Sequence, residues 1–267
     1  MLFAVGPVNS AGREFATTFE PDGRVVYFNR ILESGAIPIF RSRFEDGAWS
    51  PARPVEFTDE RFLDVDPFVS PDGQRLYFTT DRSEGPEASE DFDIWMAERD
   101  GDGWAAPTRL PSPPNSPASE AFVSVTRDGT LYFGSRNTPD GSRRVLASRP
   151  VDGVYGPAEE VDLGIPAGVL AGNPMVLPDE SAIVFTSRTD AGDVDLYVSF
   201  RKPDGSWQAA RRLAAPINSE QADFAPGLGP GGALFFSSER PGVVPAPEGD
   251  ERPPGDLYYV AWPPATR

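Results

Sequence analysis

The sequence predicts an all-β fold: a five-bladed β-propeller of four-stranded antiparallel blades, with the ring closed by the N-terminal strand joining the last blade. Three observations predict it. A sequence repeat of about fifty residues occurs five times along the 267-residue chain. Each copy carries a tight-turn motif between two apolar segments. The last copy lacks a fourth strand, which the N-terminus can supply.

The first two strands of each copy are defined by the turn between them. In Pro-Asp-Gly, proline presets the φ angle of the turn, aspartate caps it, and glycine adopts the positive φ that a bulged hairpin needs. An apolar strand such as Glu120–Ser124 precedes each turn, and an alternating aromatic strand such as Leu76–Phe78 follows it. The five turns are Pro21-Asp22-Gly23, Pro71-Asp72-Gly73, Arg127-Asp128-Gly129, Pro178-Asp179-Glu180 and Pro230-Gly231-Gly232.

A third and a fourth strand complete each copy. Segments such as Asp93-Ile94-Trp95 form the third strand, and in four copies an Asp-Gly turn then leads to an aromatic residue and a short fourth strand. We interpret these aromatic residues as packing between blades rather than as a platform for sugars. They are Trp49, Trp104, Tyr155 and Trp207.

The N-terminus repeats the end of the fourth copy. Met1–Ser10 resembles Leu213–Ser219, and the fifth copy stops after its third strand. We therefore expect a closing strand within residues 1–10, because an open blade would leave an unpaired strand edge. The whole chain is then a single domain, 1–267. Its expected blades span about 11–57, 58–111, 112–163, 164–214 and 215–267.

The composition excludes several classes of function. The chain has no histidine and no cysteine, so Ser-His-Asp or Cys-His catalysis, histidine- or thiolate-bound zinc and disulfides are all excluded. A net charge of −17 opposes binding to nucleic acid and to anionic membranes, because both rely on clustered lysine and arginine. No apolar run reaches the roughly 18 residues needed to cross a bilayer, so we expect no membrane insertion. No leader, a basic segment followed by an apolar one, is visible after Met1.

The complete repeat resembles the sequence repeat of a known protein family. It consists of an acidic residue, Pro-Asp-Gly, Leu-Tyr-Phe, an arginine, Asp-Ile-aromatic and Asp-Gly before Trp, as in the stretch from Asp64 to Trp104. This pattern is similar to the WD40-like (PD40) repeat of TolB-type propellers, over essentially the whole chain. The resemblance implies a periplasmic or secreted protein that binds a protein or another cell-envelope component. The sequence contains neither the hydrolase domain nor the peptidoglycan-binding module that accompany such repeats in other proteins, so we expect a bare propeller.

One set of repeated acids could carry function. Glu14, Asp64, Glu120 and Asp223 precede the turns, and we expect them near one mouth of the central channel, with Asp66 nearby. Such carboxylates would repel one another unless they were hydrogen-bonded, protonated or bound to a cation. Three interpretations stay open. The acids could lock the blades together; Glu14, Asp64, Glu120 and Asp223 could bind Ca²⁺ in the channel; or Asp64, Asp66, Glu120 and Asp223 could catalyse glycoside hydrolysis.

A second set is an arginine after each second strand. We expect three of these arginines to pair with the third-strand acids Asp93, Asp195 and Asp256 of their own copies. Arg30 and Arg136 belong to copies without that acid, which leaves them free to bind an anionic ligand. The five arginines are Arg30, Arg82, Arg136, Arg188 and Arg240.

The sequence therefore favours a non-catalytic binding or scaffold propeller that recognises its partner through one face, with no obligatory cofactor. The alternative is the carboxylate-dependent glycoside hydrolase, and a third interpretation is a structural propeller with a large apolar patch. The irregular segments 83–91 and 241–254 join second to third strands, and we expect them to project from the binding face.

Overall fold

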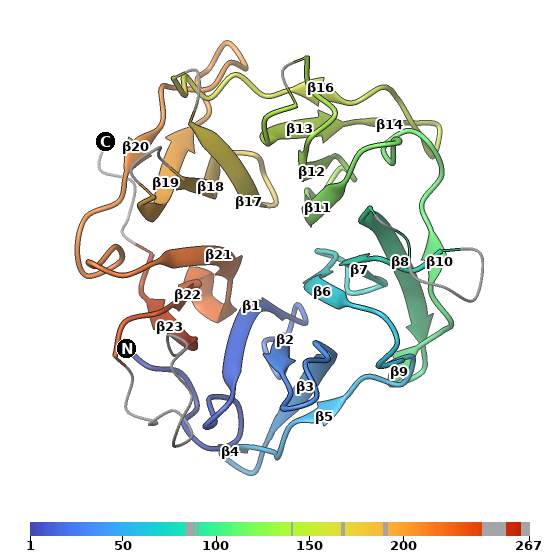
Figure 1. The fold of residues 1–267 in the computed structure, drawn as a ribbon, viewed down its shortest axis with the longest axis vertical. Helices are drawn as coiled ribbons and strands as arrows, with labels where there is room; N and C mark the ends of the chain where they lie inside the picture. The colour runs from blue at the N-terminus through green and yellow to red at the C-terminus, as the bar shows by residue number, and fades with distance from the viewer. Residues whose placement is uncertain are drawn as a thin grey trace.

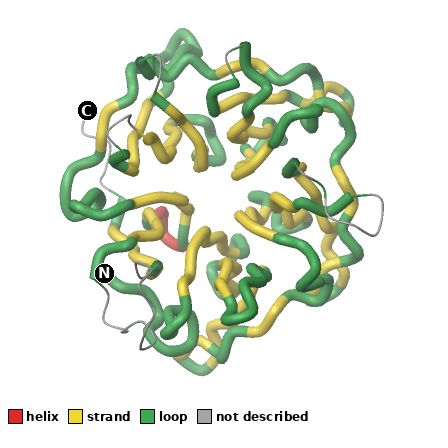
Figure 2. Tube along the Cα trace, viewed as in Figure 1, coloured by secondary structure: helices red, strands yellow, loops and turns green. Residues whose placement is uncertain are grey.

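A computed structural model describes residues 1–83, 89, 91–139, 141–166, 169–188, 192–241 and 255–262. Five antiparallel blades surround a central channel, which confirms the predicted propeller (Figure 1). Strands and loops make up almost all of it, with one 3-10 turn at Pro230–Gly232 (Figure 2). Among the described residues, no helix has the length and apolar character to cross a membrane. The segments 83–91 and 241–254, expected on the binding face, lie largely outside the described residues.

Each blade is built from the channel outward in chain order. The innermost strands are β1 (Arg13–Phe19), β6 (Asp64–Val69), β11 (Glu120–Val125), β17 (Leu170–Val176) and β21 (Asp223–Leu228). The second strands are β2 (Val25–Ile31), β7 (Arg75–Thr80), β12 (Leu131–Ser135), β18 (Ala182–Arg188) and β22 (Leu234–Ser238). The third strands are β3 (Ile39–Glu45), β8 (Asp93–Asp100), β13 (Arg144–Ser148), β19 (Val194–Phe200) and β23 (Asp256–Val260). We number the blades 1 to 5 in this order.

The outer strands are short. Fourth strands of two residues each pair with the third strands of blades 1 to 4: β5 (Arg53–Pro54), β10 (Thr108–Arg109), β16 (Glu159–Glu160) and β20 (Arg211–Arg212). Small hairpin strands extend some of the outer turns: β4 (Ala48–Trp49), β9 (Gly103–Trp104), β14 (Pro150–Val151) and β15 (Val154–Tyr155).

The turns between first and second strands form as the sequence predicts. In blade 2, the Oδ1 of Asp72 accepts the backbone N–H of Gln74 at 3.0 Å, and Gly73 has a φ of 71°. These turns lie together at one end of the blades, which we call the turn face. The opposite end, where second strands connect to third strands, is the loop face.

Aromatic side chains fill the spaces between neighbouring blades. Trp104 of blade 2 packs edge-on against Tyr27 of blade 1 with centroids 5.9 Å apart, and donates its Nε1–H to the tyrosine hydroxyl at 3.1 Å. Trp207 of blade 4 meets Tyr132 of blade 3 at 6.3 Å. Trp49 packs against Phe3 at 5.4 Å. The hairpin aromatics therefore contribute to the core between blades, as interpreted from the sequence.

The N-terminus closes the ring, as predicted. Leu2 pairs antiparallel with Tyr258 of β23, and the N–H of Phe3 donates to the carbonyl of Leu257 at 2.9 Å. The Asn9 side chain accepts the N–H of Leu257 at 2.8 Å and donates to its carbonyl at 2.9 Å. Asn218 makes the same two bonds to Leu196 of blade 4, at 2.8 and 2.9 Å. The likeness between the two segments therefore reflects one side-chain device that fastens a fourth strand to a third.

Candidate functional site

The repeated acids at the start of the innermost strands belong to the scaffold. Arg30 pairs with Glu14, Arg82 with Asp64 and Arg240 with Asp223, each at 2.6 Å. The three carboxyl side chains are at most 2% exposed. Each arginine also donates to a carbonyl of the segment that leads into its blade, as Arg82 does to Phe57 at 3.0 Å. The pairs therefore fix the innermost strand to the preceding connection.

The predicted pairing of Arg82, Arg188 and Arg240 with the third-strand acids Asp93, Asp195 and Asp256 is wrong. Thr80, two residues before Arg82, pairs with Asp64 on the innermost strand and with Asp93 on the third strand. Arg82 is therefore close to both acids, and it forms its ion pair with Asp64. Asp93 is instead paired with Arg109 of the fourth strand at 2.7 Å. Blade 4 repeats this outer pair between Asp195 and Arg212 at 2.6 Å.

The outer pair also explains the copies that depart from the repeat. In blade 3 the charges are exchanged, with Arg144 on the third strand and Glu160 on the fourth strand, 3.6 Å apart. In blade 5 the closing strand places Leu2 where blades 2 and 4 carry Arg109 and Arg212. The Oδ2 of Asp256 consequently has no hydrogen-bond partner among the described residues, and burial together with the charge of Glu14 raises its pKa to about 6.

Glu120 has no arginine partner but is fully engaged. Its carboxylate accepts the hydroxyls of Ser116 and Ser135, both at 2.7 Å, and the N–H of Ser116 at 2.8 Å. Burial raises its pKa, although these hydrogen bonds act in the opposite direction. Within the described part of the chain, no group of three or more acidic side chains is placed to hold a metal ion. The four proposed metal ligands, Glu14, Asp64, Glu120 and Asp223, are each occupied within their own blade.

The two arginines predicted to be free have different surroundings. Arg30 is paired with Glu14, so that prediction is corrected: the innermost-strand acid, not the third-strand acid, is its partner. Arg136 follows β12 on the loop face, is exposed, and forms no ion pair with the residues that the structure describes.

Substitution of the paired arginines should separate scaffold from surface. We expect Arg30→Ala and Arg82→Ala each to lower the free energy of unfolding by about 3 kcal/mol, because each leaves a buried carboxylate without its partner. Arg136→Ala should change it by less than about 0.5 kcal/mol, as is usual for an exposed side chain. Urea denaturation of the three variants measures this. A loss for Arg136→Ala equal to the other two would show that the pairs are not what stabilises the blades.

The centre of the channel is a narrow neck formed by a bulge in every innermost strand. Each bulge begins with a residue at positive φ, and the pairing register shifts at that point. The five residues are Ala16, Asp66, Phe122, Asn173 and Ala225, with φ between 48° and 58°. They line a cavity of about 40 Å³. That is room for a few water molecules, and too little for a sugar ring.

The bulges also carry a ring of hydrogen bonds between blades. The N–H of Asp66 donates to Oδ1 of Asn29 in blade 1 at 2.8 Å, and the N–H of Phe122 to Oγ1 of Thr79 in blade 2 at 3.0 Å. Likewise, the N–H of Ala16 donates to Oγ of Ser237 at 3.1 Å. The N–H of Ala225 donates to Oγ1 of Thr186 at 3.2 Å. Only between blades 3 and 4 can this bond not form, because Gly134 stands at the equivalent position and has no side chain.

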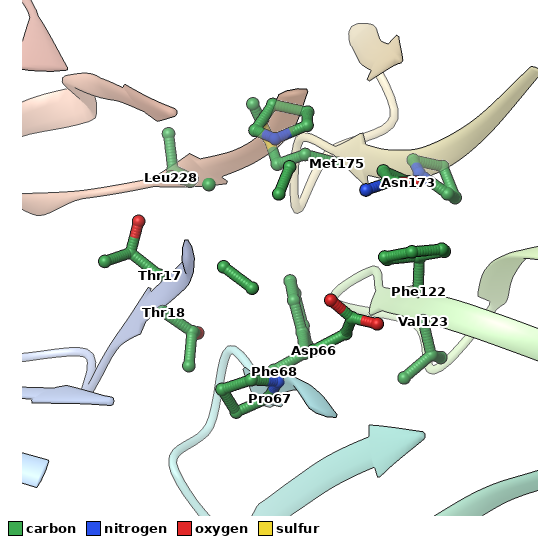
Figure 3. Close-up of a pocket in the computed structure, with 15 residues that line it drawn as sticks. Thr17, Thr18, Asp66, Pro67, Phe68, Phe122, Val123, Asn173, Met175 and Leu228 are labelled. Carbon is green, nitrogen blue, oxygen red and sulfur yellow. The ribbon is translucent and has the colours of Figure 1, made fainter. Parts of the chain in front are cut away.

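Asp66 is the one bulge residue with an ionisable side chain, and nothing in the repeat accounts for it. It is 6% exposed, and its Oδ1 has no hydrogen-bond partner among the described residues. Figure 3 shows the carboxyl directed into the neck beside the ring of Phe122. Burial raises its pKa to about 8, opposed by the charge of Arg143. Thr17, which lines the same cavity, likewise has an unpartnered Oγ1.

Arg143 was not singled out from the sequence. It precedes β13 and extends between blades 3 and 4, where its guanidinium carbon lies 5.6 Å from the centroid of Phe122. Its Nη1 is buried without a partner among the described residues, and burial lowers its pKa. Alignment of the copies offers a signal that could have revealed it, since the equivalent positions hold Ile37, Phe92, Val194 and Gly255.

The neck opens to the turn face through a wider funnel. This funnel has a volume of about 280 Å³ and shares Thr18, Phe68 and Leu228 with the neck. Its rim is formed by the first residues of the five turns: Pro21, Pro71, Arg127, Pro178 and Pro230. Arg127 is thus the one charged side chain on a rim of prolines, and it is exposed.

The geometry does not assemble a pair of catalytic carboxyls in the channel. Hydrolysis of a glycoside needs two carboxyl groups about 5 to 9.5 Å apart with space for a sugar between them. Of the four candidates, Asp66 lines the neck, whereas Asp64, Glu120 and Asp223 are held by arginine or serine within their blades.

Comparisons with known proteins agree with the fold and do not select a function. No protein-family profile and no curated protein sequence matches the chain. A solved thermostable family-43 glycoside hydrolase is similar with a TM-score of 0.56 at 14% identity, covering 95% of this chain and 91% of that one. TolB from Acinetobacter baumannii gives 0.53 at 14%, covering 94% of this chain and 52% of its own. A gluconolactonase from Xanthomonas campestris gives 0.50 at 19%, covering 87% and 72%. Solved structures with this propeller shape therefore include a TolB propeller and two enzymes.

Proposed function

We propose that this propeller is a non-catalytic binding module that engages a protein or another cell-envelope component through its turn face, where the channel opens as a funnel. The observation that supports the proposal is that the repeated acids of the innermost strands already have partners within the scaffold. The carboxylates that could have acted in pairs are paired with arginine or bonded to serine, and a single carboxyl remains in a neck too small for a sugar ring.

The turn face offers the better binding surface for two reasons. It carries a concave funnel in which apolar side chains stand beside the polar side chains of Thr18, Glu20, Ser70 and Arg127, a combination that ligand sites use. It also carries Arg127 as a charged side chain that forms no ion pair with the described residues, and arginine is frequent at the centre of interfaces. The resemblance to TolB-type repeats supports a partner in the cell envelope and a location in the periplasm or outside the cell.

A pair of charge-reversing variants tests the proposal. Arg127 and Arg136 belong to the same blade, are both exposed, and lie on opposite faces. The immobilised protein is screened against purified muropeptides, lipopolysaccharide and a displayed library of random peptides. We expect a binder whose affinity falls at least tenfold in Arg127→Glu and is unchanged in Arg136→Glu.

Three outcomes would contradict the proposal. A binder lost only in Arg136→Glu would move the site to the loop face, where the sequence first suggested it. Absence of any binder in the three sources would reject the partner class. Hydrolysis of aryl glycosides that disappears in Asp66→Asn would establish an enzyme.

A further inference from the structure

The interface between blades 1 and 2 and that between blades 3 and 4 are built in the same way around a tyrosine and a tryptophan. In both, an arginine lies over the indole ring. The guanidinium carbon of Arg99 is 3.8 Å from the ring centroid of Trp104, and that of Arg201 is 4.8 Å from the centroid of Trp207. Trp104 is 5% exposed, whereas Trp207 is partly exposed. The first interface is therefore closed where the second is open.

An arginine of blade 1 closes the first interface. Arg41 pairs with Glu56 at 2.5 Å and donates to the carbonyl of Asp102 in the blade 2 hairpin at 3.1 Å. Arg43 donates to the same carbonyl at 3.1 Å. The hairpin lies so close that a Cβ atom at Gly103 would be 3.1 Å from Oε1 of Glu56. A guanidinium thus occupies the space between these two blades, held by a carboxylate and a hairpin carbonyl.

The interface between blades 3 and 4 lacks each of these closing features. Ala147 stands at the register position of the first arginine, opposite the tyrosine. Asp162 takes the place of the glutamate, with a side chain one methylene shorter. Ser206 takes the place of the hairpin glycine. Within the described part of the chain, no hydrogen bond joins the hairpin of residues 202–206 to blade 3. The result is a groove of about 560 Å³, lined by these three residues and by Trp207.

The groove retains groups that can accept a guanidinium. The exposed carboxylate of Asp162 lines it, as does the hairpin residue Gly205, whose carbonyl is at the position that binds two arginines in the closed interface. Glu159 lies directly opposite Ala147 in the strand register and adds a second exposed carboxylate. A guanidinium has only donors, and its planar fork matches a carboxylate in geometry and in charge.

The groove also contains positive side chains, and these are compatible with a further guanidinium. Arg149 and Arg201 line it and are both paired with Glu180, at 3.2 and 3.5 Å. Arginines at the same two positions accompany Arg41 in the closed interface. Lys202 is a real difference, because blade 2 has an aspartate there, and its charge should weaken the binding of a cation.

We propose that the groove between blades 3 and 4 binds an arginine side chain of a protein partner. Its guanidinium lies between Asp162, Glu159 and the hairpin, in the place that Arg41 fills between blades 1 and 2. The net charge of −17 favours a basic partner, because opposite charges steer association over a distance. The volume falls within the roughly 300–1,000 Å³ of ligand pockets. This site goes beyond the proposed function, since the groove shares no lining residue with the funnel.

The test titrates the ¹⁵N-labelled full chain with the capped tripeptides Gly-Arg-Gly, Gly-Lys-Gly and Gly-citrulline-Gly. NMR follows the indole N–H resonance of Trp207, assigned with Trp207→Phe. We expect a saturable shift with the arginine peptide and at least fivefold weaker binding of the lysine peptide, which lacks the planar fork. The citrulline peptide, similar in shape but uncharged, should not bind. Free arginine should bind no more tightly than the arginine peptide.

Variants of the two interfaces provide matched controls. Ala147→Arg should fill the groove from within, which abolishes peptide binding and raises the melting temperature. Asp162→Asn should weaken binding at least fivefold by removing a carboxylate, and Lys202→Asp should strengthen it. Arg41→Ala opens the equivalent space between blades 1 and 2, so it should create a second site that shifts the indole resonance of Trp104.

Specific results would overturn the proposal. An arginine peptide that leaves the Trp207 resonance unchanged contradicts it, as does equal binding of the citrulline peptide or wild-type affinity in folded Ala147→Arg. Tighter binding of a capped Gly-Glu-Gly peptide would assign the groove to anions, and tighter binding of free arginine would assign it to an amino acid. The groove is separate from Arg127, so failure of this inference and failure of the proposed function can be told apart.

Discussion

Deletion of residues 1–10 is expected to lower the melting temperature by more than about 10 °C, far beyond the effect of trimming an unstructured terminus. The deletion removes the pairing of Leu2 with Tyr258, the side-chain bonds of Asn9 to Leu257, and the buried ring of Phe3. It also leaves β23 as an unpaired edge in an opened ring, which exposes backbone groups that favour aggregation.

Point variants show whether the loss comes from closure. Phe3→Ala and Asn9→Ala remove the packing and the strand fastening separately, and each should reproduce part of the loss. Val5→Ala is the matched control within the same segment, because Val5 is 51% exposed. Differential scanning calorimetry measures all four proteins. A deletion variant that melts at the wild-type temperature would show that the ring does not depend on the N-terminal strand.

Asp64→Asn and Asp66→Asn are expected to change stability in opposite directions, although the two residues are neighbours on β6. At pH 8, Asp66→Asn should raise the free energy of unfolding by about 2 to 4 kcal/mol, because it removes a buried carboxyl that resists ionisation. Asp64→Asn should lower it by about 3 kcal/mol, because Arg82 loses the carboxylate that neutralises it.

The pH dependence of the Asp66 effect follows from its raised pKa. In the unfolded chain the carboxyl ionises near pH 4, whereas in the folded protein it ionises at about 8. The folded state therefore binds the extra proton between these values, and the contribution of Asp66 to stability falls as the pH rises from about 4 to 8 and is constant above. Asparagine does not titrate, so the advantage of Asp66→Asn should be small at pH 4 and full at pH 8. Urea denaturation across this range measures it, and a loss of stability in Asp66→Asn at pH 8 would show that Asp66 is a scaffold acid like Asp64.

The fold was predictable because each of its parts is coded locally. The Pro-Asp-Gly turns and the alternating aromatic strands specify hairpins, and the likeness of the N-terminus to Leu213–Ser219 reflects a shared asparagine that fastens one strand to another. These signals come from residues close in sequence or from a contact that recurs in several blades. The strands and turns inferred for one repeat therefore predict those of the other repeats.

The partners of the charged residues were less predictable. Arg82 lies within reach of Asp64 and Asp93 alike, and sequence spacing does not decide which acid it takes. The outer pair of Asp93 with Arg109 joins residues that no motif connects. Asp66 was noticed only as a neighbour of the repeated acids, and its isolation in the neck depends on bulges in all five innermost strands. Arg143 became visible through Gly134 and Gly172, two small residues in different blades.

The most direct test of this account is the titration of the Asp66 side chain, followed by NMR through its ¹³C carboxyl resonance and assigned with Asp66→Asn. A midpoint near pH 8 is predicted, since the carboxyl is buried in the neck with an unpartnered oxygen. A midpoint near that of an exposed aspartate, about pH 4, would show that the group is ionised and satisfied in the folded protein, and would contradict the account of Asp66 as a buried, unpaired carboxyl at the centre of the ring.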